Sequence, residues 1–118
     1  ASVHYAYDAK GNLYWLSLRN TRHSQELREN KCTAAAILID PDKKQCIDMT
    51  GEAFELTGAA SKKAHKIYGA RYGQKEERLI EALSNEFDAR AYYIFRPTSV
   101  CLFDMKTFPE NPRQEYNV

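Results

Sequence analysis

The chain has 118 residues, which suits one domain with a single hydrophobic core. Its 17 basic and 16 acidic residues give a net charge of +1, so a general nucleic-acid or membrane-surface binder is not favoured. No apolar run approaches the ~20 residues that cross a bilayer, and the first residues lack the features of a signal peptide. We therefore expect a cytoplasmic protein, whose three widely spaced cysteines remain reduced and half-buried.

The first half of the chain is expected to form four strands and one short helix. Alternating or continuous apolar patterns predict the strands, which span residues 1–7, 13–18, 33–40 and 45–56. A turn at Gly11-Asn12 joins the first two into a hairpin, and another turn is expected at Pro41-Asp42. Thr21 is predicted as the N-cap of a helix over 22–30. The third strand is expected to be largely buried, and Gly51 to introduce a bulge into the fourth.

The second half is expected to form two helices, two strands and a tail. Their predicted ranges are 62–72 and 75–87 for the helices, 89–97 and 98–105 for the strands, and 106–118 for the tail. Ser61 is predicted to cap the first of these helices, Gly73 to end it, and Pro97 to separate the two strands. The tail is expected to wrap over a surface. The sum is a mostly β fold, an antiparallel barrel with appended helices, forming one domain over 1–118. Because the chain starts on a strand, a preceding strand or helix is expected to complete that domain.

The turn between strand 13–18 and helix 22–30 carries a concentration of anion-binding groups. Thr21 supplies a hydroxyl, Arg22 a guanidinium and His23 an imidazole. A helix N-terminus adds unpaired N–H groups and a partial positive charge. A phosphate monoester is the natural ligand for such a set, and His23 would contribute most when protonated. The alternative is that Thr21 is only a cap and that the two basic residues are ordinary solvated side chains.

The order of these features resembles the FMN-binding split-barrel family, the superfamily of pyridoxamine 5′-phosphate oxidase. The matching pieces are the strand before "TRH", a short helix ending in "REN", a buried strand and a strand reading "TGEAFEL". They cover residues 1–58, and "YYIFRPTSVCLFD" resembles the closing strands of the family. The resemblance implies a split β-barrel that binds FMN and acts on a small molecule. It also implies a homodimer with the cofactor sites at the interface.

The resemblance also implies which residues hold the cofactor. Thr21, Arg22 and His23 would grip the FMN phosphate. Leu16 and Ser17 would offer backbone and hydroxyl contacts to the ribityl chain or the ring edge. Gln45 falls within about a residue of a glutamine that contacts flavin in the oxidase, but a slip of one residue would turn it to the other face of its strand. No catalytic residue is identified.

One departure from the family separates this chain from the vitamin B6 oxidase. The oxidase has an arginine and a lysine on the strand that corresponds to "ASVHYA". Here those positions are about Ala1 and Ala6, with only His4 nearby. B6 oxidation is therefore not expected.

Other candidate residues are expected to have structural roles. Three functions remain possible. Tyr14 and Trp15 are expected in the core or a dimer interface, His4 as an ordinary strand residue and His65 on a solvated helix face. The histidines lack ligand spacing, so no metal site is expected. The open functions are an FMN-dependent oxidoreductase, a flavin-binding sensor or carrier without turnover, and a split barrel that binds haem or a deazaflavin instead.

Overall fold

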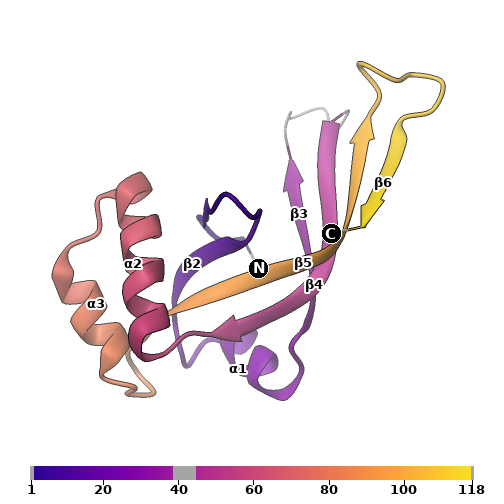
Figure 1. Cartoon of the computed structure of the whole chain (residues 1–118). Coiled ribbons are helices and arrows are strands. Elements are labelled where there is room, and N and C mark those ends of the chain that lie inside the picture. The colour runs from indigo at the N-terminus through magenta and orange to yellow at the C-terminus, as the bar shows by residue number, and fades with distance from the viewer. Residues whose placement is uncertain (1, 39–44, 118) are drawn as a thin grey trace. The chain divides into compact units, whose positions relative to one another are not determined.

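The computed structural model describes residues 2–38 and 45–117, and Figure 1 shows the course of the chain. Within these residues the chain forms six strands and three helices. The strands are β1 (Ala6–Tyr7), β2 (Leu13–Leu18), β3 (Cys32–Leu38), β4 (Gln45–Glu55), β5 (Arg90–Asp104) and β6 (Arg113–Asn117). The helices are α1 (Arg22–Glu29), α2 (Gly58–Tyr72) and α3 (Glu76–Leu83). The strands are hydrogen bonded in the order β1-β2-β5-β4-β3, and β6 pairs with β5. The predicted mostly β fold with appended helices is confirmed.

The described chain divides into two compact units. The first contains the residues up to Lys31 together with Ala53–Arg96, and the second contains Cys32–Glu52 together with the residues from Pro97 onward. Strands β4 and β5 are long enough to contribute to both units. No described helix is long and apolar enough to span a bilayer.

The first unit holds the main hydrophobic core. Strand β2 pairs antiparallel with β5, so that Tyr14 lies opposite Ile94 and Leu16 opposite Tyr92. The side chains of these paired residues pack against α2 and α3, which lie side by side (Figure 1). The buried members of this cluster are Ala6, Tyr14, Leu56, Ala64, Tyr68, Ala82, Tyr92 and Ile94. Because side chains alternate along a strand, Trp15 and Tyr93 point to the opposite face, where their rings stack at 5.5 Å. Tyr14 and Trp15 are thus core residues, as predicted.

A buried arginine ties the end of β2 to the end of α3. The Arg19 side chain is only 2% exposed, and its guanidinium donates to the carbonyl oxygens of Ala82 at 2.6 Å and Glu86 at 2.8 Å. Its Nε also lies 3.4 Å from a carboxylate oxygen of Glu55. The cation therefore satisfies the Ala82 carbonyl in the last turn of α3, and it shares the Glu86 carbonyl with the N–H of Ala89.

The second unit consists of two antiparallel strand pairs. Strand β3 pairs with β4 through Cys32↔Glu52 to Leu38↔Cys46, and β5 pairs with β6 through Ser99↔Asn117 to Phe103↔Arg113. The Asp104 carboxylate closes the turn after β5 by accepting from the N–H groups of Lys106 and Thr107. The tail is therefore a paired strand, which corrects the expectation that it wraps over a surface.

Three strand predictions are wrong in detail. Gly51 lies in unbroken register opposite Thr33, so it introduces no bulge against β3. Pro97 does not break β5, because it lies between the stretch paired with β2, which ends at Phe95, and the stretch paired with β6, which begins at Ser99. Strand β3 is not largely buried, since its residues alternate between exposed and half-buried.

The helix and thiol predictions have mixed outcomes. Helix α2 begins at Gly58 after Thr57, not at Ser61, because the two alanines before Ser61 extend it by a turn. Ser61 is fully buried inside the helix, and Gly73 ends it in the left-handed conformation, as predicted. Cys46 and Cys101 are half-buried, whereas Cys32 is exposed. The turn predicted at Pro41-Asp42 and the position of Ala1 lie outside the described residues.

Candidate functional site

The junction of β2 and α1 is built around the carbonyl oxygen of Leu18. Thr21 has extended backbone and caps α1, its hydroxyl accepting from the N–H of Ser24 at 3.4 Å. The Thr21 hydroxyl lies 3.0 Å from the Leu18 oxygen, and the buried Ser24 hydroxyl donates to the same oxygen at 2.8 Å. The predicted N-cap is confirmed, and the two hydroxyls fix the turn between the strand and the helix.

His23 joins this cluster through its ring. Its Nε2 lies 2.9 Å from the Ser17 hydroxyl and 3.4 Å from the Thr21 hydroxyl. Ser17 comes from the end of β2, and His23 from the first turn of α1. Three of the residues predicted from the sequence, Ser17, Thr21 and His23, are thus brought together by side-chain contacts.

Arg22 stands at the same helix end but points into solvent. Its side chain is 93% exposed, and its Nε donates to Glu26 at 2.9 Å across one helical turn. Within the described chain, the backbone N–H groups of Arg22 and His23 have no acceptor. The first turn of α1 contains no acidic residue. The junction therefore offers free N–H donors, an exposed guanidinium and an imidazole, and that turn contains no acidic side chain.

The other two predicted residues have different settings. Leu16 pairs with Tyr92 of β5, and its side chain packs on the core. Strand β1 pairs with only Leu13 and Tyr14 of β2. In the described residues, β1 therefore does not pair with the part of β2 that follows Tyr14. Gln45 belongs to the second unit, where its amide donates to Asp104 at 3.1 Å. No described contact connects Gln45 with the junction, and its role stays a prediction.

A carboxylate behind α1 holds the helix in place. Glu55 accepts hydrogen bonds from Arg28 at 2.7 Å and from the Tyr93 hydroxyl at 3.1 Å, and Arg19 lies at 3.4 Å. Partial burial raises the pKa of Glu55, but the bonds from Arg28 and Tyr93 and the charge of Arg19 outweigh it and leave the pKa lowered. The cluster links the residue after β2 and the last turn of α1 to the sheet, so the intervening turn is pre-organised.

The remaining histidines lie apart from this junction. His65 is half-buried, and its Nδ1 lies 2.5 Å from the Tyr92 hydroxyl, so the prediction of a solvated helix-face residue is wrong. Burial raises the pKa of Tyr92 to about 12, which keeps its hydroxyl protonated as a partner for the ring. His4 is exposed, with its ring edge against Tyr72. Among the described residues, no three histidine, cysteine or acidic side chains gather as a metal site.

Comparison with solved structures identifies the architecture. The chain is similar to a haem-binding protein from Mycobacterium smegmatis, with a TM-score of 0.71 and 12% identity, over 98% of this chain and 45% of that one. It is also similar to a pyridoxamine 5′-phosphate oxidase-related, FMN-binding protein from Nostoc punctiforme, with a TM-score of 0.59 and 7% identity, over 98% and 71%. The chain has the split-barrel fold. This outcome confirms the fold implied by the sequence resemblance.

The split barrel is also shared with a protein of unknown function, Atu2129 from Agrobacterium tumefaciens, with a TM-score of 0.67 and 15% identity. That match covers 86% of this chain, which spans 43% of the length of Atu2129. No model of a protein family matches the sequence, and no curated protein matches it. At these identities the comparisons establish the split-barrel fold alone.

Proposed function

We propose that this split barrel binds FMN through the β2–α1 junction and acts as an FMN-dependent oxidoreductase on a small organic substrate. The observation that carries the proposal is the convergence of Ser17, Thr21 and His23 at a helix N-terminus with free N–H groups, beside the exposed Arg22. These groups fit a phosphate monoester, whose oxygens accept from N–H, O–H and guanidinium donors. The name of the Nostoc neighbour supports FMN as the molecule that carries the phosphate.

Each side chain has a distinct part in holding the phosphate. With a proton on Nε2, His23 donates to the Ser17 oxygen, which leaves the Ser17 proton free for a phosphate oxygen. Arg22 exchanges Glu26 for the phosphate at little cost, because an exposed i,i+4 ion pair is worth about 0.3–0.5 kcal/mol. Thr21 keeps its capping role. Bound FMN would supply the hydride or electron transfer, while the chain binds and orients it.

The second candidate function is haem binding, which the Mycobacterium smegmatis neighbour favours by its name. Against it, the Nε2 of His23 is already hydrogen bonded to the Ser17 hydroxyl. A deazaflavin and a flavin carrier without turnover are further alternatives. The visible spectrum of the overexpressed, purified protein separates flavin, deazaflavin and haem, because the absorption belongs to the cofactor, and only turnover of a substrate separates the oxidoreductase from a carrier. Flavin bands, with FMN released on denaturation, support the proposal, and a haem Soret band overturns it.

We expect the protein to be a homodimer with its cofactor sites at the interface. Within its described residues the second unit buries only one hydrophobic side chain, Met49, while Leu38, Met105, Phe108 and Tyr116 are 44–60% exposed. A unit that leaves this much apolar surface open gains burial by association. Sedimentation at micromolar concentration should give twice the chain mass. A monomer at that concentration would exclude the shared site.

Pyridoxamine phosphate should not be a substrate. Ala6, at one position where the B6 oxidase has a cation, is 2% exposed and packs in the core, so it can reach no substrate charge. His4 is the one basic side chain on residues 2–6. Incubation with FMN and pyridoxamine phosphate should therefore yield no pyridoxal phosphate. Measurable turnover would refute this prediction.

A further inference from the structure

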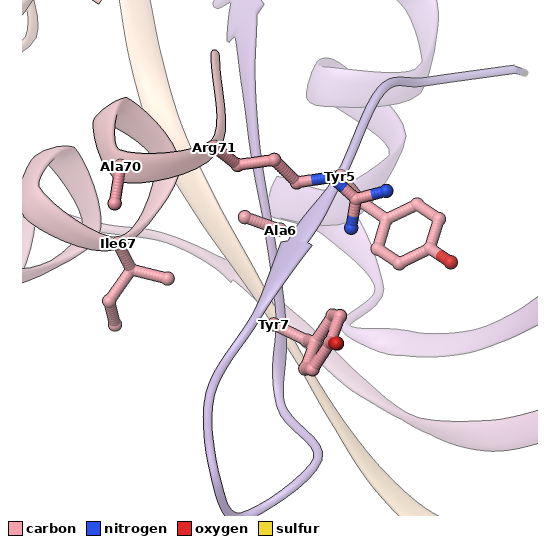
Figure 2. A pocket seen from close by; sticks show the side chains of 6 residues that line it. All are labelled: Tyr5, Ala6, Tyr7, Ile67, Ala70 and Arg71. Atoms are coloured by element: carbon pink, nitrogen blue, oxygen red, sulfur yellow. The ribbon is translucent and has the colours of Figure 1, made fainter. Parts of the chain in front are cut away.

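An open cleft lies between β1 and the last turns of α2, in the first unit and formed by different residues from the β2–α1 junction. It has a volume of about 570 Å³ and is lined by Tyr5, Ala6, Tyr7, Ile67, Ala70 and Arg71. This volume falls within the range of small-molecule sites. Figure 2 shows Arg71 reaching from the helix toward Tyr5, with Ala6 directed back toward the helix.

Aromatic rings surround the guanidinium of Arg71. Its central carbon lies 5.2 Å from the centre of the Tyr5 ring, 5.5 Å from that of Tyr72 and 6.0 Å from that of Tyr7. Tyr5 and Tyr7 lie two residues apart on an extended segment, so their rings fall on the same side of the backbone. The rings contact the cation through cation–π interactions, and its N–H groups have no acceptor among the described residues.

The cleft contains hydrogen-bond donors without a carboxylate to satisfy them. Within the described residues Arg71 has no acidic partner, and the hydroxyls of Tyr5 and Tyr7 have no hydrogen-bond partner. The nearest acidic residue along the hairpin, Asp8, is fully engaged: it accepts from the Tyr14 hydroxyl, the Asn12 amide and two backbone N–H groups. An anion is therefore the complementary ligand.

Two contacts keep the walls of the cleft in place without a ligand. The Tyr72 hydroxyl donates to the carbonyl oxygen of Tyr5 at 2.6 Å, which ties β1 to α2. The Asp8 contacts hold the hairpin that carries Tyr7. A site whose walls are fixed beforehand loses less conformational freedom on binding.

We propose that this cleft binds a small planar aromatic carboxylate. The carboxylate pairs with the Arg71 fork in bidentate fashion, and the phenol groups of Tyr5 and Tyr7 add donors and stacking surface. Ala6, Ile67 and Ala70 supply the apolar floor for the ring. A single cation at the negative end of a helix matches one carboxylate charge better than a phosphate dianion. The proposal does not depend on FMN.

The test follows 2-naphthoate by NMR, with 2-naphthylmethanol as its neutral counterpart. Naphthoate should shift the Ile67 methyl and Arg71 Nε–H resonances saturably, while the alcohol should bind at least tenfold more weakly. Arg71→Met should weaken naphthoate about tenfold to a hundredfold, the loss expected for one charged, paired contact. Arg71→Lys, which keeps the charge but not the fork, should fall between the parent and Arg71→Met.

Arg96→Met is the matched control. Arg96 also lies over an aromatic ring, Phe54 at 5.8 Å, but does not line the cleft, so its removal should leave naphthoate binding unchanged. Equal binding of naphthoate and the alcohol would show that the cleft does not recognise the carboxylate, and it would overturn the proposal. Resonance shifts confined to other residues, or full binding by Arg71→Met, would also overturn the proposal.

Discussion

Arg19→Met should lower the free energy of unfolding by about 3 kcal/mol and the unfolding midpoint by roughly 10 °C. The side chain is 2% exposed, and its removal leaves the buried Ala82 carbonyl without its guanidinium donor, whereas the Glu86 carbonyl keeps the N–H of Ala89. It also leaves Glu55 with Arg28 as its remaining cation. The estimate takes the lower end for a broken buried pair because the Glu55 side chain is 22% exposed and keeps that partner. Thermal and urea unfolding measure the loss.

The pH dependence of this loss has a definite sign. The pKa of Glu55 is lowered in the fold, so its contribution to stability is present above the pKa of the unfolded carboxyl and is lost as pH falls through the lower, folded pKa. The gap between Arg19→Met and the parent should therefore narrow in acid. Arg22→Ala is the control, since its 93% exposed ion pair should change stability by less than about 0.5 kcal/mol. Equal stability of Arg19→Met and the parent would show that the buried guanidinium does not hold β2 to α3.

Arg22→Ala should weaken FMN binding by roughly one to two powers of ten. The expected loss is one paired, charged hydrogen-bond contact of about 1.5–3 kcal/mol, at about 1.4 kcal/mol per tenfold. Because the side chain is solvent-exposed and outside the core, the variant should remain folded. Riboflavin, which lacks the phosphate, should bind the variant and the parent alike. Equal weakening of FMN and riboflavin would mean general damage to the site.

Glu26→Gln is a control variant that should not weaken FMN binding as Arg22→Ala does. It releases Arg22 from its ion pair and removes a negative charge one helical turn away. FMN should then bind as tightly as to the parent or about twofold more tightly, given ~0.3–0.5 kcal/mol for such a pair. Weaker FMN binding by Glu26→Gln would show that the carboxylate, not the guanidinium, supports the ligand.

Local signals in the sequence predicted the N-cap of α1 correctly. The hydroxyl at Thr21 caps the helix it precedes, and the placement of Ser17 at a strand end let it meet His23 across a three-residue turn. Both contacts join residues at most six positions apart, so patterns of neighbouring residues determine them. Thr57, by contrast, precedes α2 without a side-chain cap bond, so a capping pattern did not predict the start of that helix.

The contacts that brace the junction depend on long-range packing. Glu55 meets Arg28 across 27 residues and Tyr93 across 38, and Arg19 reaches Glu86 across 67. From the sequence, an arginine after a strand is expected at the surface, because arginine is rarely buried. The prediction that His65 lies on a solvated helix face is wrong for the same reason, because its partner Tyr92 lies on another element. No local pattern marks these pairs.

Titration of the apoprotein with FMN and with riboflavin tests most directly whether the β2–α1 junction binds a phosphate. Trp15 is the one tryptophan, and its ring stacks on Tyr93, whose hydroxyl donates to Glu55 behind α1, so quenching of its emission by a bound flavin reports occupancy. We predict that FMN binds at least tenfold more tightly than riboflavin and that this ratio falls toward one in Arg22→Ala. Equal affinity of the parent for the two flavins, or binding of neither, would contradict the account.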